Sequence, residues 1–220
     1  MKIQELADKI SNGVLKNFEK HGFKYRKKKQ EFVRKTNNAE QIFRLYYYKQ
    51  NDGTITIKPE IVIHIYDIES IYKKIAQIEY RPYLTIGNYF SNIKDYDGDS
   101  ANYKNKPTRF WLMENDDDVL HLIKIIPEYL AEDILPYFDK NSSIERVDGL
   151  LNAYPEKMSV HNAIYPLRAN IAIIAAKLNK NSYYDELVDA YEKKIEDAEE
   201  NYKIEFYKLK KLLASKEFTS

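Results

Sequence analysis

The sequence predicts an α+β protein, with an antiparallel β-meander sheet flanked by helices and followed by an all-helical C-terminal half. Three observations favour this class. Apolar residues in the first 20 positions recur every three or four residues, as in an amphipathic helix. Residues 23–66 contain short runs rich in aromatic and β-branched residues, which is typical of strands. From residue 116 onward helical spacing returns and continues to the end of the chain.

The apolar spacing predicts that the N-terminal half begins with a helix over residues 2–20. Gly22 is a suitable C-terminal stop for this helix. Strand-like runs follow in "FKYRK", "EFVRK", "QIFRLYYYKQ" and "TITIKPEIVIHIY", and "NDG" predicts a hairpin turn between the last two. A second helix is expected over residues 68–79 and a strand in "RPYLTIGNYF". A polar loop over residues 91–107 and a final strand in "TRFWLM" complete this half.

The second half is predicted to be helical throughout. "DDDVLHLIKIIPEYLAEDILPYF" predicts a helix with acids at its N-terminus and a kink near Pro127. "SIERVDGLLNAY" predicts a shorter amphipathic helix, and "LRANIAIIAAKL" a helix enclosed by others. The last helix is expected over residues 182–214, roughly 50 Å long, either packed on the preceding helices or paired with another chain in a homodimer. We therefore divide the chain into a sheet domain, residues 1–113, and a helical region, residues 114–220, that packs on it or extends from it.

The composition restricts the chemistry. The 220 residues include no Cys, which excludes disulfides, thiolate zinc sites and a Cys nucleophile, and which fits a reducing compartment. The N-terminal residues lack the continuous apolar core of a secretory signal, and no run of about 20 apolar residues occurs. A cytoplasmic protein without membrane contact is expected.

The sequence carries no recognisable catalytic, metal or cofactor motif. The six Gly residues are isolated, which excludes a P-loop and a dinucleotide fingerprint. The four His residues never occur at metal-ligand spacing, "DYDGDS" departs from a calcium loop, and "ENDDD" is typical of a helix N-terminus. No catalytic residue, metal or cofactor is therefore predicted. An enzyme would need a site assembled from dispersed acids and His64, His121 or His161.

Charge is distributed unevenly along the chain. Residues 1–113 carry 21 Lys/Arg and 13 Asp/Glu, a net charge of +8, whereas residues 114–220 carry 14 and 21, a net charge of −7. The stretch "KHGFKYRKKKQEFVRK", residues 20–35, alone has eight Lys/Arg and one acid, Glu31. This asymmetry favours an electrostatic partner, although the two halves can also satisfy each other.

Side chains alternate across a strand, so the predicted strands place cations and aromatic rings on the face that points away from the core. The candidate partner-binding residues on this face and at its edge are Lys24, Arg26, Lys28, Arg44, Tyr46, Tyr48, His64 and Tyr66. Tyr and Arg are favoured at protein interfaces, so an acidic protein surface is a suitable partner. RNA or single-stranded DNA is the alternative, but the sequence pI of about 7.7 disfavours a dedicated nucleic-acid binder. The face could also be solvated, or covered by the acidic half of the chain.

The order of these signals resembles an uncharacterised bacterial family, domain of unknown function 4304. The resemblance covers about residues 8–140 and depends on "NFEKHGFKYRKKKQEFVRK", the strand ending in "VIHIY", "YRPYLTIGNYF" and "RFW". It implies an α+β domain without an established activity. Related small bacterial families often look like immunity proteins that bind and neutralise a cognate toxin. We therefore expect a non-enzymatic protein-binding protein with an immunity or antitoxin-like role. Residues 142–220 have no counterpart in the family, and this leaves the transfer of a partner open.

Overall fold

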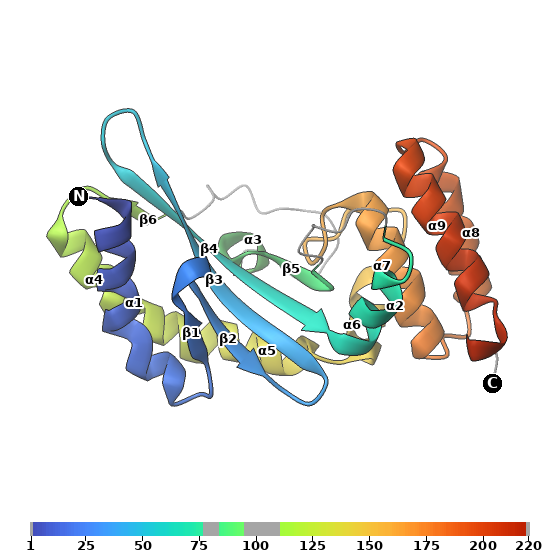
Figure 1. Cartoon of the computed structure of the whole chain (residues 1–220), viewed down its shortest axis with the longest axis horizontal. Coiled ribbons are helices and arrows are strands. Elements are labelled where there is room, and N and C mark those ends of the chain that lie inside the picture. The colour runs from blue at the N-terminus through green and yellow to red at the C-terminus, as the bar shows by residue number, and fades with distance from the viewer. Residues whose placement is uncertain (1, 77–83, 95–110, 219–220) are drawn as a thin grey trace.

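The computed structural model describes residues 2–76, 84–94 and 111–218, and it confirms the α+β class with a helical C-terminal half (Figure 1). The strands, in chain order, are β1 Lys24–Arg26, β2 Glu31–Lys35, β3 Ala39–Lys49, β4 Ile55–Ile65, β5 Ile86–Tyr89 and β6 Trp111–Met113. The α-helices are α1 Ile3–Glu19, α2 Tyr66–Lys73, α3 Phe90–Lys94, α4 Asp116–Tyr129, α5 Leu135–Asn141, α6 Ile144–Asn152, α7 Tyr165–Leu178, α8 Tyr184–Ile195 and α9 Glu200–Leu213. Short 3₁₀ turns lie at Lys27–Lys29 and Lys216–Phe218.

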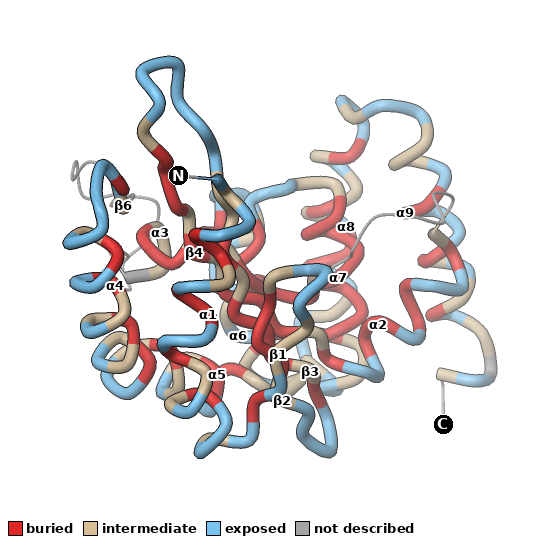
Figure 2. Tube along the Cα trace, turned by 60° about the vertical axis from the view of Figure 1, so that its left-hand side comes forward, coloured by how far each residue is buried: buried red, intermediate tan, exposed pale blue. Residues whose placement is uncertain are grey.

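The sheet is the antiparallel meander that the sequence predicts. Strands β1 to β5 pair in sequence order. Strand β6 also pairs with β4, at the end of β4 opposite to the one that pairs with β5. The predicted "NDG" turn joins β3 to β4, and Gly53 occupies it with a φ of 90°, a conformation that suits glycine. The β3–β4 hairpin reaches beyond the rest of the sheet (Figure 1), and its tip is exposed (Figure 2).

The inner face of the sheet, on which α1, α4 and α5 pack, holds the main core. Phe18 of α1 stacks on Phe32 of β2 and Phe43 of β3, at ring-centroid distances of 4.0 and 5.3 Å. Phe138 of α5 contacts Phe23 at 6.0 Å. Because α4 and α5 begin after residue 113, part of the helical half completes the core of the sheet.

The helical run after β6 starts and bends as its sequence suggests, with one difference. Asn115 caps α4 by accepting hydrogen bonds from the N–H groups of Asp117 and Asp118. A kink is expected near Pro127, and α4 passes through this residue without ending. The irregularity follows three residues later as a π turn, Leu130–Ile134, before α5 begins.

The predicted single helix over residues 182–214 is wrong, because the structure has two helices there. The backbone of Glu199 is extended, with φ −60° and ψ 150°, and separates α8 from α9. Both helices pack on α7 and on each other at one end of the molecule (Figure 1). A straight helix would carry the apolar side chains of α9 away from α7, so tertiary packing overrides the local periodicity. The basis for a homodimer through one long helix is therefore absent.

Two other boundaries differ from the sequence prediction. Tyr66, predicted as the last outward residue of β4, is the first residue of α2, and this helix ends at Lys73. Phe90–Lys94, predicted as the end of a strand and the start of a loop, forms the short helix α3. The rest of the predicted loop, including the "DYDGDS" segment, lies outside the described residues, as do residues 77–79 of the predicted second helix.

Candidate functional site

The outer face of the sheet carries a row of alternating charges, which we call the charge ladder. Arg26, Glu31, Arg44 and Glu60 stand directly opposite one another on β1, β2, β3 and β4. Glu31 lies between the two arginines, with Oε1 3.2 Å from Arg26 Nη1 and Oε2 2.9 Å from Arg44 Nη2. Arg44 Nη1 also lies 3.1 Å from Glu60 Oε2. Opposite charges on adjacent strands stabilise the pairing of those strands.

Burial makes this ladder part of the scaffold. The side chain of Glu31 is 1% exposed, and that of Arg44 is 16% exposed. Arg26 also forms a two-pronged contact with Glu40. Burial alone would raise the pKa of Glu40, but the hydrogen bond and charge of Arg26 outweigh it and lower this pKa. Burial raises the pKa of Glu60 despite the nearby Arg44. The acids that meet Arg26 and Arg44 therefore come from the sheet itself and not from the acidic second half of the chain.

A second group on the outer face, beside the ladder, is the tyrosine–lysine patch, defined by Tyr46, Tyr48, Lys58 and Tyr89. Tyr46 contacts Tyr48 and Tyr89 at ring-centroid distances of 6.4 and 6.3 Å. Lys58 Nζ lies 5.0 Å from the Tyr48 centroid and 5.7 Å from that of Tyr89, within the range of a cation–π contact. Burial, with a hydrogen bond to Tyr48, raises the pKa of Tyr89 to about 12. The patch is thus a preformed group of neutral rings around a cation.

The other predicted site residues are dispersed around this face. Lys24 is exposed on β1, and Lys28 is exposed in the 3₁₀ turn between β1 and β2. His64 lies on the outer side of β4 with Nδ1 3.1 Å from Glu69 Oε1. Tyr66, 37% exposed, belongs to α2 and not to the strand. The structure thus brings Arg26, Arg44, Tyr46 and Tyr48 together, whereas Lys24, Lys28, His64 and Tyr66 lie at the rim.

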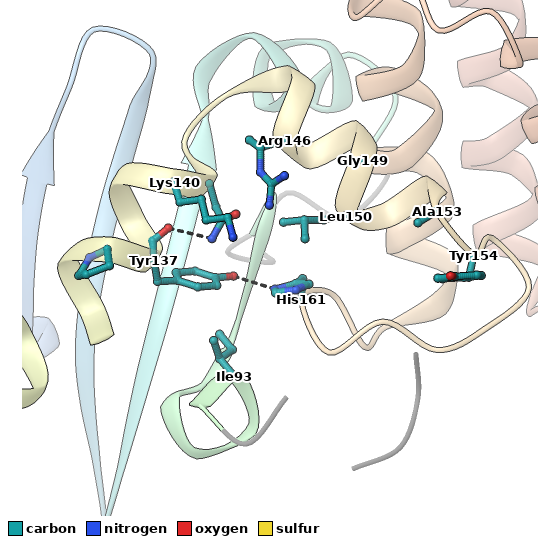
Figure 3. Close-up of a pocket in the computed structure, with 11 residues that line it drawn as sticks. Ile93, Tyr137, Lys140, Arg146, Gly149, Leu150, Ala153, Tyr154 and His161 are labelled. Atoms are coloured by element: carbon teal, nitrogen blue, oxygen red, sulfur yellow. Dashed lines mark hydrogen bonds between the residues drawn. The ribbon is translucent and has the colours of Figure 1, made fainter. Parts of the chain in front are cut away.

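The next candidate site is a pocket of about 470 Å³, which we call the α5–α6 pocket, and none of its described lining residues belongs to the patch. Figure 3 shows residues that line it. Tyr137, Lys140 and Asn141 line it from α5. One face of α6 and the two residues that follow the helix, from Arg146 to Tyr154, line the opposite wall, and His161 closes it from the segment before α7. No carboxylate is among the described residues that line it.

His161 is 6% exposed and contacts the Tyr137 hydroxyl, which lies 3.0 Å from its Nδ1. Burial, together with the charges of Arg146 and Lys140, lowers the pKa of His161 to about 4, so the imidazole is neutral at pH 7. Burial raises the pKa of Tyr137, which keeps its phenol protonated. The pocket walls therefore combine two cations with neutral hydrogen-bonding groups.

The enzyme alternative needs dispersed acids and histidines to meet in a pocket, and the described residues that line the α5–α6 pocket include one histidine and no acid. His64 lies on the outer sheet face, His121 is exposed on α4, and only His161 lines the pocket. Within residues 2–76, 84–94 and 111–218, no three His, Asp or Glu side chains gather in a way that could hold a metal ion. No helix in this part of the chain combines the length and apolar character needed to cross a membrane.

Two features of these sites were missed in the sequence. The charge ladder requires the register of four strands, and each strand considered alone shows only its own cations or acids. The pocket leaves a weaker signal in Arg146, the third residue of α6, where the positive end of the helix dipole disfavours a cation. Such a residue suggests a role other than helix stability.

Comparison of the chain with family models, with curated proteins and with solved structures found no match. The resemblance to domain of unknown function 4304 therefore stays a prediction.

Proposed function

We propose that this chain is a non-enzymatic protein-binding protein whose outer sheet face contacts an acidic surface of its partner, with the tyrosine–lysine patch at the centre of the contact. The observation that carries this proposal is the preformed patch on the solvent side of a projecting hairpin. None of its three rings belongs to the main core of the protein. Tyrosines held by their neighbours bury a large area at a small cost in conformational entropy, which makes them effective anchors.

The geometry supports different roles for the residues of this face. Arg26 and Arg44 are occupied by Glu31, Glu40 and Glu60, so we assign them to the scaffold. The exposed Lys24 and Lys28 lie at the rim, where charge mainly accelerates association and selects partners. The aromatic patch then supplies most of the affinity. The family resemblance makes a toxin the first partner class to test, in an immunity or antitoxin-like role.

The test compares two double variants whose tyrosines are matched in exposure. Tyr48→Ala with Lys58→Glu alters the patch, whereas Tyr207→Ala with Lys208→Glu alters α9. Tyr48 and Tyr207 are 40% and 41% exposed. Each chain is cross-linked in the cells that produce it, and captured proteins are quantified by mass spectrometry. We expect an acidic protein that the unchanged chain and the α9 variant capture and the patch variant loses. Equal capture by all three chains, with folds confirmed by circular dichroism, would exclude the patch as the contact.

RNA or single-stranded DNA remains the alternative ligand, because the rings could stack on bases and lysines could meet phosphates. That alternative predicts an affinity that falls steeply with salt, since binding releases counterions. Gel-shift titrations at low salt decide the question. Retardation that disappears in the patch variant would favour nucleic acid over a protein partner, and no retardation would remove the alternative.

A further inference from the structure

We propose that the α5–α6 pocket binds a small phosphate ester with an aromatic body, of the nucleoside monophosphate class. The pocket is separate from the tyrosine–lysine patch, and this inference does not depend on the proposed protein partner. A volume of about 470 Å³ is within the usual range of small-molecule sites. The chemistry of its walls defines three parts of the ligand, namely an anion, a hydrogen-bond donor and an apolar body.

The anion is defined by two cations that come from different helices. Lys140 and Arg146 reach toward the same space from α5 and α6 (Figure 3). Arg146 Nε is buried and has no hydrogen-bond partner among the described residues. A buried donor without a partner is costly, and a bound oxyanion would remove that cost. Arginine also suits phosphate because its planar group donates two parallel hydrogen bonds.

A donor on the ligand is indicated by Asn141, which lines the pocket and is 4% exposed. Its Nδ2 donates to the Tyr137 carbonyl over 2.9 Å, while its Oδ1 has no partner among the described residues. This oxygen can only accept a hydrogen bond. A ligand that carries a hydroxyl or amino group beside its phosphate would satisfy both Asn141 and Arg146, whereas inorganic phosphate alone offers no apolar body for the rest of the pocket.

The apolar body is defined by the face of α6 beyond Arg146. Gly149 and Leu150 follow on this face, and Ala153 and the 46% exposed Tyr154 continue the wall just after the helix ends (Figure 3). A Cβ added at Gly149 would meet no atom within 4 Å, so this wall leaves room for a ligand. An aromatic ring lying along Leu150 and Tyr154 would place its phosphate near Arg146.

The wall formed by His161 is built into the fold. The Gly87 N–H donates to the His161 carbonyl over 2.6 Å, and Asn88 Nδ2 donates to the Val160 carbonyl over 2.7 Å. The rings of His161 and Tyr137 stack at a centroid distance of 5.8 Å. The pocket is therefore held open by contacts to β5 and α5 without a ligand, and such preorganisation reduces the entropic cost of binding.

The test is isothermal titration calorimetry of the full chain with adenosine monophosphate, adenosine and inorganic phosphate. We expect saturable binding of the monophosphate and at least tenfold weaker binding of the other two. Arg146→Ala should weaken the monophosphate at least tenfold, and Gly149→Phe should abolish binding by filling the wall while it leaves both cations in place. Lys208→Ala on α9 should bind as the unchanged chain does.

Three results would overturn the inference. The first is no saturable binding of the monophosphate at millimolar concentration. The second is adenosine or inorganic phosphate binding as tightly as the monophosphate, which would contradict the assignment of an anion or of an aromatic body. The third is an unchanged affinity in a folded Gly149→Phe variant, which would place any bound ligand outside the pocket.

Discussion

Arg44 on β3 lies directly opposite Glu31 on β2, and its Nη2 donates to Glu31 Oε2 over 2.9 Å. The Glu31 side chain is almost completely removed from water, and Arg44 and Arg26 are its ion-pair partners. The basic stretch at residues 20–35 therefore has a structural role as well as a proposed binding role. Arg26 in this stretch and Arg44 on the next strand both hold Glu31, so a substitution of either arginine would lower stability before it reported on binding.

The ladder predicts a large stability loss for Glu31→Ala. Glu31→Ala removes charge-assisted hydrogen bonds to both arginines, although Arg26 keeps Glu40 and Arg44 keeps Glu60, so the free energy of unfolding should fall by about 2 kcal/mol. Urea denaturation measures this change. Glu128→Ala, at an exposed position of α4, should change stability by less than about 0.5 kcal/mol. A loss below about 1 kcal/mol in Glu31→Ala would show that the ladder does not stabilise the sheet.

His161 predicts a loss of stability in mild acid. Among the described residues, the groups that act on it include Tyr137 and Lys140 of α5 and Arg146 of α6. Its pKa is about 4 in the folded chain and about 6.5 when unfolded, so the unfolded state binds the additional proton between these values. The contribution of the neutral His161 to the free energy of unfolding should be fully present above pH 6.5. The free energy of unfolding should decrease by about 3 kcal/mol as the pH falls to 4.

Substitution of His161 isolates the contribution of its imidazole to the pH dependence of stability. His161→Gln does not titrate and can still accept from Tyr137, so its stability should vary less between pH 6.5 and 4 than that of the unchanged chain. Urea denaturation across this range provides the measurement, and His121→Gln, at an exposed site, is the matched control. Parallel stability curves for His161→Gln and the unchanged chain would contradict the assignment.

Two helical glycines should respond in opposite directions to alanine. At Gly149 the added Cβ meets open space, so Gly149→Ala should stabilise α6 by up to about 1 kcal/mol. At Gly13 the Cβ would lie 2.8 Å from two Ile123 side-chain carbons, and overpacking of about 1–3 kcal/mol outweighs the helical gain. Thermal unfolding of both variants tests this difference. A destabilised Gly149→Ala would mean that the wall of the pocket is not open.

Local periodicity was sufficient to predict the strands and most helices, because their apolar residues recur at the spacing of the element that they form. The strand alternation of Arg44, Tyr46 and Tyr48 is confirmed, and so is the enclosed helix α7. Periodicity did not predict the break between α8 and α9 at Glu199. No Gly or Pro marks this turn in the sequence, and the turn allows α9 to pack back on α7. Glu205, which interrupts the apolar stripe, is buried and accepts a hydrogen bond from Tyr72 of α2 over 2.7 Å.

The sites were harder to predict because they depend on residues that are distant in sequence. The patch joins β3 and β4 to Tyr89 of β5, and the pocket joins two helices to His161. Arg168 gives a similar example inside α7. It is 2% exposed and donates to the carbonyls of Leu151, Tyr154 and Lys157 near the end of α6. Its position in an apolar run indicates burial but does not identify these acceptors.

The most direct test of the proposed function is the dissociation constant of the purified acidic partner for three chains, measured by calorimetry. We predict that Tyr48→Ala with Lys58→Glu weakens binding by about 30-fold or more, as expected when an interface loses an anchor worth about 2 kcal/mol. Tyr207→Ala with Lys208→Glu should leave the constant within about twofold. Equal dissociation constants for all three chains would contradict the claim that the outer sheet face is the binding surface.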